Sequence, residues 1–570
     1  MRRTSAWIAA LLGPVLPALL VAVPALGWVW NATERASWAA LGRDQGIFQY
    51  IAWAVGQGDV AFRDVRDVNG PVIPMVHAFF QALGGTDEHR FRVLDLLCTG
   101  LSFVIAGALV PSITGRRVEP HVRVAWAVAV WVAASAQYLV YGFWDTAQRE
   151  SFLDWFVLVA IALQATHHAA ADPRTRSAMA TLLASGALSF VPWLGKPTFA
   201  LFTAVQLAVL VAEPGGRRTR LRRAMTFLAG GTLGLTAPLV WLALRGDVGA
   251  WARITFVDVP AMYRFIWPRP ASAILSLPGY ARTAQIAVAT SIGLGALVVM
   301  RRLPLRAVPI ASMPVVGLLS VLVQGKGFPY HFHPVTLGTA FGWVVGLAAL
   351  WDHARARENR GGRELQAAVV VASILVGMRA GWLGWAAPYP VAPPPEARDK
   401  ASVESAERLS AFDRIDYFPR AMRDAAEYLA ARTSAGDRVQ TYAMDPYLLF
   451  LAGRRSATPY IYVYDLDVDA AVHGSFDPDG VRPTAEQADR IRAMREEHVR
   501  DLSQRLERDP PAAFVFTDNC LLMSSEDAVH DFAVQLPELA VWLASRYRQT
   551  ADFEGVRIWL RDDLAAREPP

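Results

Sequence analysis

The sequence predicts a polytopic α-helical membrane protein that carries a C-terminal extracytoplasmic α/β domain. Of its 570 residues, 53% are hydrophobic and only 19% are charged, which is too apolar for one soluble domain and too charged for membrane spans alone. Apolar blocks separated by short Arg-rich loops continue to about residue 387, and the sequence beyond reads as soluble. A Pro-rich run separates the two parts.

These observations divide the chain into three parts. Residues 1–387 form the membrane part, which includes a long first outer loop at 30–89. Residues 388–395 form the linker, and residues 396–570 form the extracytoplasmic domain.

About eleven segments have the roughly 20 apolar residues that cross about 30 Å of hydrocarbon. The first has a short basic lead but a longer apolar stretch than a signal peptide, so we interpret it as an uncleaved anchor. The predicted spans are 7–29, 90–111, 123–142, 150–167, 177–194, 197–213, 224–244, 282–300, 307–324, 332–350 and 366–387.

The orientation follows from the basic residues of the short loops, because cytoplasmic loops are enriched in Lys and Arg. With the N-terminus in the cytoplasm, every inner loop is basic and the C-terminal domain lies outside the inner (plasma) membrane. The inner-loop residues are Arg116, Arg117, Arg174, Arg176, Arg217, Arg218, Arg220, Arg222, Arg223, Arg301, Arg302, Arg306, Arg355, Arg357, Arg360 and Arg363.

Two function classes are excluded. The net charge of +5 is spread among these loops rather than gathered on one soluble face. We therefore predict the lipid bilayer as a partner and not nucleic acid. The two cysteines, Cys98 and Cys520, cannot build a disulfide framework or a Cys-based metal site.

Carboxylates gather in the first outer loop. Asp44 begins a stretch whose apolar positions follow helical spacing, as in an amphipathic helix lying at the membrane interface; Asp44 could also simply cap that helix. Asp64 and Asp67 follow, and could bind a metal, hold a sugar or act as a base. Pairing with Arg63 and Arg66 is the alternative.

Other polar residues lie at short turns between spans on the same predicted outer side. Arg149 and Glu150 sit where charge costs a few kcal/mol unless it is paired or faces water. Lys196 and Lys326 contradict the basic-inside bias and are expected to meet a phosphate, with snorkelling as the alternative. His331 and His333 would need a third ligand to bind zinc, so hydrogen bonding to phosphate suits them better.

The extracytoplasmic domain alternates helical and strand patterns. We predict helices at 418–432 and 535–547 and a helix start at 447–451. Strands are predicted at 438–442, 512–517 and 556–560, and 484–508 is predicted to be a solvated helix.

Four separated segments resemble a known family. The stretch DQGIFQYIAWAVGQGDVAFRDVRDVNGP, followed by AQRESFL, GKPTFALF and QGKGFPYHFHP, resembles GT-C glycosyltransferases of the bacterial protein-mannosyltransferase-like and lipopolysaccharide-core Rgt-like group. One departure is that Gln45 follows Asp44 where many relatives have a second acid, which puts in doubt any role carried over for that position.

The resemblance implies a membrane enzyme that transfers a sugar from a polyprenyl-phosphate donor to a glycan, lipid or protein acceptor on the extracytoplasmic face, usually with inversion. It implies Asp44 as the catalytic base. It assigns substrate binding to Asp64, Asp67, Arg149 and Glu150, and binding of the donor phosphate to Lys196, Lys326, Tyr330, His331 and His333.

No metal or other cofactor is predicted, since fixed cations can hold a monophosphate leaving group. The acidic residues of the first outer loop leave a bound divalent ion as the alternative. Two other function classes stay open. A transporter or flippase of lipid-linked saccharides would need charges deep in the spans and on both sides. A non-catalytic scaffold for envelope assembly would leave the one-sided polar set unexplained.

Overall fold

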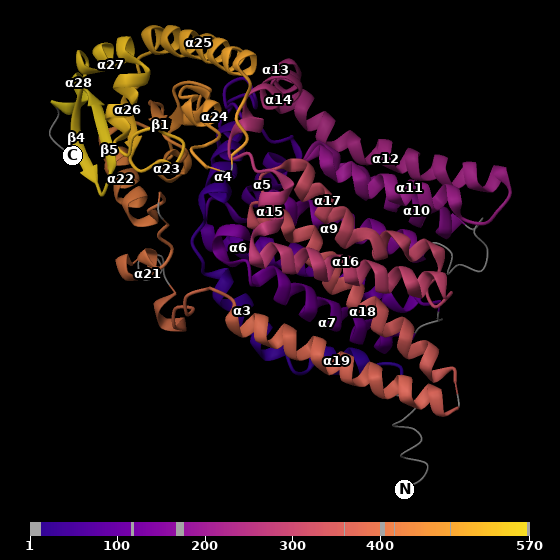
Figure 1. Ribbon diagram of the computed structural model, residues 1–570. Helices are drawn as coiled ribbons and strands as arrows, with labels where there is room; N and C mark the ends of the chain where they lie inside the picture. The colour runs from indigo at the N-terminus through magenta and orange to yellow at the C-terminus, as the bar shows by residue number, and fades with distance from the viewer. Residues whose placement is uncertain are drawn as a thin grey trace. The chain divides into compact units, whose positions relative to one another are not determined.

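The computed structural model describes residues 13–115, 119–166, 176–357, 359–398, 405–414, 416–478 and 480–566. Within these ranges the chain forms two compact units (Figure 1). The first contains residues up to 39, 89–238 and 274–392; the second contains residues 40–88, 239–273 and 393 onward. Whether 396–570 is an independent domain stays a prediction. The inner-loop residues Arg116, Arg117 and Arg174 lie outside the described residues.

The first unit is a bundle of long apolar helices. Eight helices of the described chain are long and apolar enough to cross a membrane, or nine if the bent pair α2 and α3 is one span. They include α6 (Glu88–Ile113), α7 (Pro120–Leu139), α10 (Arg176–Phe190), α12 (Arg217–Arg245), α16 (Pro278–Val299), α17 (Val308–Gln324), α18 (His333–Arg355) and α19 (Arg360–Ala386). The chain is therefore a multi-pass membrane protein, and its number of spans stays a prediction.

Three of the predicted spans take a different form. The first is broken into α2 (Leu16–Ala22) and α3 (Leu26–Ser37), which are bent by 47°; Pro24 lies in the break and cannot continue a helix. Predicted span 150–167 corresponds to α9 (Arg149–Thr166), which carries three charged residues, and 197–213 corresponds to the shorter α11 (Ala200–Ala212).

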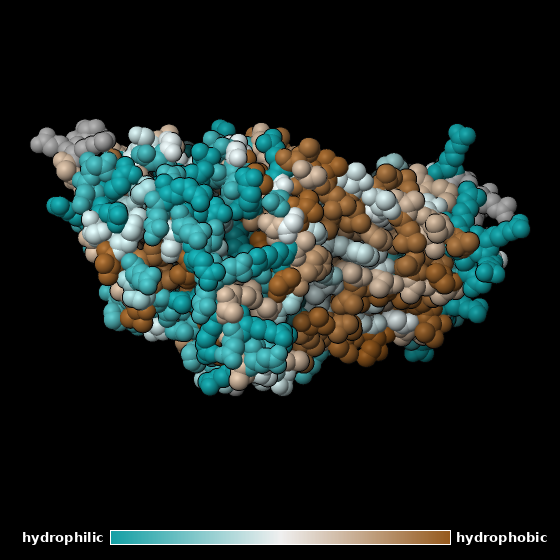
Figure 2. All heavy atoms as spheres, turned by 90° about the horizontal axis from the view of Figure 1, so that it is seen from above, coloured by the Kyte–Doolittle hydropathy of each residue, from teal (hydrophilic) through white to brown (hydrophobic). Residues whose placement is uncertain are grey.

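Helix α18 lies at the centre of the bundle, since 83% of its most apolar window is buried. It packs against α16, α17 and α19, and α19 packs on α2 and α3. Glycines permit close contacts: a Cβ at Gly186 of α10 would lie 2.0 Å from the carbonyl oxygen of Phe227 in α12, the small-residue packing typical of membrane helices. The lipid-facing surface is apolar, and hydrophobic residues gather over the long helices in Figure 2.

The second unit contains a five-stranded sheet in the order β2-β1-β3-β5-β4. Strands β1 (Arg438–Tyr442), β2 (Arg455–Ser456) and β3 (Ala513–Thr517) are parallel, and β5 (Val556–Arg561) runs antiparallel to β3 and to β4 (Tyr547–Phe553). Its helices include α22 (Pro419–Arg432), α23 (Tyr447–Ala452), α25 (Ala485–Arg508), α26 (Ala528–Gln535) and α27 (Pro537–Ala544).

The predicted elements are present, but β2 and α26 were not predicted, and the chain differs from the prediction near residue 547. The predicted helix at 535–547 ends at Ala544, and the polar strand β4, which no pattern predicted, begins at Tyr547. Segments 40–88 and 239–273 supply α4 (Arg43–Gly56), α5 (Val72–Gly84), α13 (Val248–Arg253), the π-helical turn Ile254–Asp258, α14 (Val259–Ala261) and α15 (Ala271–Ser276).

Candidate functional site

The predicted site residues divide between the two units. Asp44, Asp64 and Asp67 belong to the second unit. The first unit holds the other seven, which are Arg149, Glu150, Lys196, Lys326, Tyr330, His331 and His333. We describe each group by itself.

Glu150 is the centre of the group in the first unit. It lies in the first turn of α9 with no exposed surface. Its Oε1 accepts a short hydrogen bond from Lys196 and lies 3.5 Å from His331 Nε2, and its Oε2 lies 4.0 Å from Arg149 Nε. A buried carboxylate is stable when it is paired in this way. Glu150 is therefore paired, and the sequence did not predict that its partner is Lys196.

The loop between α17 and the following 3-10 turn Pro329–Phe332 brings a third cation to this group. Gly325 and Gly327 turn the chain with φ of 61° and 65°, and a Cβ on Gly327 would lie 2.9 Å from Ile274. Burial, together with the positive charges of Arg149 and Lys196, lowers the pKa of Lys326 to about 7. Lys326 is thus close to the cations that contact Glu150 and to His331, and we call Arg149, Glu150, Lys196, Lys326 and His331 the cation cluster.

Aromatic rings line the cation cluster. Arg149 Nη2 donates to the Tyr330 hydroxyl at 2.8 Å and lies over its ring at 5.4 Å from the centroid. Tyr330 also contacts the His331 ring edge-on, at 4.8 Å between centroids. His331 is buried, and neither of its ring nitrogens makes a hydrogen bond within the described ranges, so it keeps donor and acceptor capacity.

His333 faces a different environment. Its Nε2 hydrogen-bonds the Asp145 carbonyl oxygen at 2.7 Å, and its ring packs on Tyr141 at 4.2 Å between centroids. With Nε2 bound to that carbonyl, Nε2 carries the proton and Nδ1 can accept. The contacts of His333 thus position the turn before α9.

In the second unit, Asp44 is the second residue of α4. Gly42 caps the helix, and its N–H donates to Gln45 Oε1 at 2.5 Å. Gln45 therefore performs a capping role at the position where many relatives carry the second acid. Asp44 itself is half-buried and is not the capping residue, so the alternative explanation for its presence is wrong.

Helix α4 forms where the sequence predicted it, but it is not a surface helix. Ile47, Phe48, Tyr50 and Ile51 are each at most 3% exposed, and α4 packs against α5 and α23. Gly46 allows this packing, because a Cβ there would lie 2.5 Å from the Tyr447 ring. The expected amphipathic exposure of this helix is therefore wrong, and its location in the membrane interface stays a prediction.

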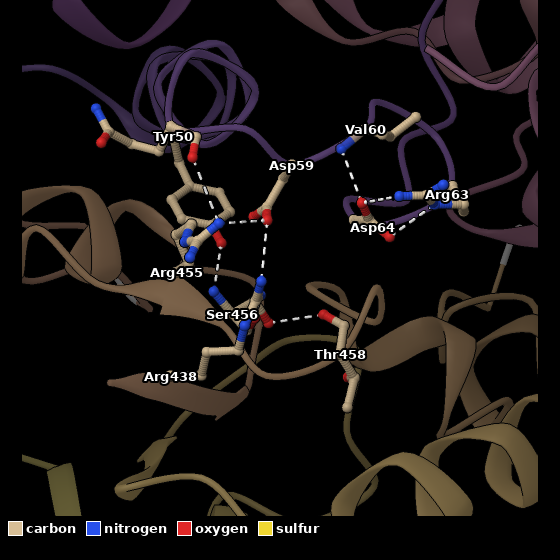
Figure 3. Close-up of polar contacts among 10 residues, drawn as sticks. Tyr50, Asp59, Val60, Arg63, Asp64, Arg438, Arg455, Ser456 and Thr458 are labelled. Carbon is tan, nitrogen blue, oxygen red and sulfur yellow. Dashed lines mark hydrogen bonds and ion pairs between the residues drawn. The ribbon is translucent and has the colours of Figure 1, made fainter. Parts of the chain in front are cut away.

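Asp67 and Asp64 have unlike environments. Asp67 is buried, and its Oδ1 accepts from Asn69 Nδ2 at 2.7 Å and from the Tyr462 hydroxyl at 3.0 Å. Asp64 is bound by its neighbours, since Arg63 Nη2 and the Val60 N–H both donate to its Oδ2 at 2.8 Å (Figure 3). Although burial opposes it, these bonds lower the pKa of Asp64. Its contacts favour the pairing alternative, and its substrate role stays a prediction.

Several buried ion pairs of the second unit were not predicted. Arg66 donates to Asp258 at 2.7 Å and to Asp465 at 2.8 Å. Arg43 donates in the same way to Asp416 at 2.7 Å and to Asp445 at 2.8 Å. These pairs join segments up to 402 residues apart in sequence.

Asp59 has the reverse arrangement, with one acid between two arginines. Arg438 and Arg455 each lie 3.1 Å from its Oδ1 (Figure 3). Beside it, the Tyr50 hydroxyl accepts from the Ser456 N–H at 2.7 Å. The only sequence signal for the burial of these residues is that each is a polar residue within an apolar stretch.

No group of three or more His, Cys, Asp or Glu side chains in the described residues could hold a metal ion. The His331 and His333 pair therefore has no third ligand among them. Metal independence itself stays a prediction.

Comparison with known proteins identifies the fold. No protein-family model matches the sequence, and no curated protein matches it. The structure of ArnT from Cupriavidus metallidurans bound to undecaprenyl phosphate superposes with a TM-score of 0.53 at 16% identity, over 96% of this chain and 99% of that one. This likeness shows that the chain has the fold of the ArnT structure. The predicted fold class, a polytopic helical membrane protein with a C-terminal α/β part, is thereby confirmed, and the subgroup stays a prediction.

An archaeal oligosaccharyltransferase is also similar. AglB from Archaeoglobus fulgidus, in complex with an inhibitory peptide and a dolichol-phosphate, superposes with a TM-score of 0.45 at 10% identity. The match covers 95% of this chain and 72% of AglB.

Proposed function

We propose that this chain is a membrane glycosyltransferase that transfers a sugar from a polyprenyl-phosphate donor to an acceptor on the extracytoplasmic face. The observation that carries the proposal is the charge of the cation cluster. Arg149 and Lys196 contact Glu150, and their positive charges act on Lys326, so three cationic side chains gather next to helices that cross the membrane. Phosphate groups pair well with such cations, and a lipid phosphate reaches that depth.

The resemblance assigns Asp44 as the base of this reaction. The acceptor hydroxyl gives its proton to that base and attacks the anomeric carbon, while the bond between that carbon and the phosphate oxygen breaks. Negative charge grows on the departing polyprenyl phosphate, where Lys196, Lys326 and Arg149 stabilise it. Attack opposite to the leaving group inverts the anomeric carbon. The fold supports this scheme, since the ArnT structure of the same fold is bound to undecaprenyl phosphate.

Three further buried charges lie at the same end of the bundle as Glu150, and two others, Arg223 and Arg306, lie near the start of α12 and just before α17. Arg92 and Asp95 lie in the first two turns of α6, and Asp154 lies in the second turn of α9. Arg92 contacts Phe143 and Thr146 at the turn before α9, so these charges gather at the same end of the bundle as Glu150. Alternating access would instead favour charges along the whole depth of the spans.

Sidedness is part of the proposal. The basic loops predict that the N-terminus is cytoplasmic, and the cation cluster then faces outward together with the loop that contains Asp44. Cysteine-accessibility labelling of intact cells at Arg360, which is expected to be protected, and at Asp489, which is expected to react, tests this orientation.

Asp44→Asn tests the mechanism. Loss of a general base lowers the rate of sugar transfer by about 10²–10⁴, while binding of the polyprenyl-phosphate sugar is retained. Transfer is measured with purified protein in detergent, and donor binding by fluorescence quenching. Asp489→Asn, the same change at an exposed residue of α25, is the control.

Two results would contradict the proposal. Full transfer by Asp44→Asn would refute the base assignment. Absence of transfer by the natural chain with several polyprenyl-phosphate sugars would favour the scaffold.

Chelation tests the metal-free form of the proposal. Because the cation cluster supplies fixed positive charge, we expect EDTA to leave the transfer rate unchanged. A loss of activity that Mg²⁺ or Mn²⁺ restores would show that an ion assists the reaction.

A further inference from the structure

A basic pocket lies in the first unit, separate from the cation cluster. It is a cavity of about 570 Å³ between the end of α6, the end of α16 and the turn that leads into α17. Three arginines line it, Arg301, Arg302 and Arg306. We call this cavity the arginine pocket.

Arg306 is the unusual member of the arginine pocket. Arg301 and Arg302 are exposed, but Arg306 is only 8% exposed. It makes no hydrogen bond or ion pair with any residue that the structure describes, and its Nε is buried without a partner there. Removing part of a guanidinium from water without a counter-ion is costly, and the rest of this group faces the pocket. A helix-end arginine that served only the positive-inside bias would extend into water instead.

The walls of the pocket indicate what supplies the counter-ion. Beside the arginines stand the apolar residues Val298, Val299 and Leu305, of which Val299 is 83% exposed and Leu305 is 37% exposed. Phosphate groups pair well with arginine, and apolar wall residues at the end of two spans suit acyl chains. A free phosphate ion would use the arginines and leave the apolar residues in water.

The pocket and the cation cluster are separate sites. Helix α17 begins next to Arg306 and ends just before Lys326, and its 17 residues correspond to about 25 Å. The donor phosphate in the proposed reaction therefore cannot be the ligand of both.

We propose that the arginine pocket binds an anionic phospholipid of the leaflet opposite the cation cluster, with the lipid phosphate on Arg306 and the acyl chains along Val298, Val299 and Leu305. Basic pockets between membrane helices bind such headgroups. This inference holds whether or not the proposed transfer reaction is correct, because it uses none of its residues.

Native mass spectrometry of the full chain in mild detergent tests the inference. The protein is titrated with dioleoylphosphatidylglycerol and, separately, with the zwitterionic dioleoylphosphatidylcholine. We expect phosphatidylglycerol to bind preferentially, and Arg306→Gln to lower its affinity about fivefold, the effect of one arginine near a lipid surface. Arg306→Lys keeps the charge and should keep most of the binding.

Arg218→Gln is the matched control, since Arg218 is an exposed residue of α12 and its loss should change nothing. Equal binding of the two lipids, or equal losses in Arg306→Gln and Arg218→Gln, would overturn the proposal. A melting temperature raised by inorganic phosphate as much as by phosphatidylglycerol would also overturn it. If Arg306→Gln does not fold, Arg302→Gln gives the same comparison at an exposed wall residue.

Discussion

Buried cations occur in both units, but the acids around them differ in number. In the second unit, Arg43 and Arg66 each contact two carboxylates. In the cation cluster of the first unit, one carboxylate serves Lys196 and Arg149, with Lys326 close by. Each of these arginines faces two acids, whereas Glu150 faces two cations, as Asp59 does between Arg438 and Arg455 in the second unit. Substitution of single members can therefore separate ion pairs that stabilise the fold from those that act on a ligand.

The largest expected effect is a loss of stability when the ion pairs of Arg66 in the second unit are removed. Arg66→Met removes the closest cation of Asp258 and Asp465 and leaves Asp258 only the longer contact with Arg253 at 3.7 Å, and removing one partner of a buried pair costs about 3–5 kcal/mol. We expect a large fall in the melting temperature measured by scanning fluorimetry in detergent. Arg63→Met is the matched control, because the exposed pair of Arg63 with Asp64 contributes about 0–1 kcal/mol. Equal effects of the two changes would refute the structural role of Arg66.

Lys196→Met is expected to act on activity rather than on folding. It removes a cation from the position where phosphate charge develops, which lowers the transfer rate by about 10²–10³. Initial rates are compared with those of Lys196→Arg, which keeps the charge. A fall in melting temperature as large as that of Arg66→Met, with the rate per folded molecule unchanged, would make Lys196 a structural partner of Glu150.

The smallest effect is a pH dependence that belongs to Lys326. Its pKa is lowered to about 7 in the free protein, and a bound phosphate raises it again, so donor binding takes up a proton. As pH rises above about 7, kcat/KM for the donor should fall by up to about tenfold per pH unit. Lys326→Arg stays charged and should remove this decline.

The contradicting result is a natural chain whose kcat/KM is flat between pH 6.5 and 9. It would mean that Lys326 carries no required charge. The cation cluster would then depend on Arg149 and Lys196 alone.

Local patterns predicted the elements but not the pairs between them. Long apolar stretches predicted the long helices, and short apolar runs predicted β1, β3 and β5. Strand β4 was missed because its residues are mostly polar, as expected for the edge of a sheet. The pairing of Asp64 with adjacent Arg63 could be foreseen from the sequence.

The pairing of Glu150 with Lys196 could not be foreseen, since 46 residues separate them. Each was identified only as a charge placed where charge is costly. Arg306 was identified only as one basic residue among many, because burial at a helix end leaves no mark in the sequence. The sequence therefore did not predict which charged side chains pair with one another or which of them are buried.

The ion pairs of Arg66 also set an order of events during synthesis. Asp465 follows Arg66 by 399 residues, which at about 5–20 residues per second delays its arrival by roughly 20 to 80 s. Over that interval Arg66 has only its earlier partner Asp258, and the later membrane segments are still being inserted. A ribosome that stalls before residue 465 would leave a chain with most of its helices made but with this network of ion pairs incomplete. The contacts of the first outer loop with Asp465 can therefore form only after about four fifths of the chain has been translated.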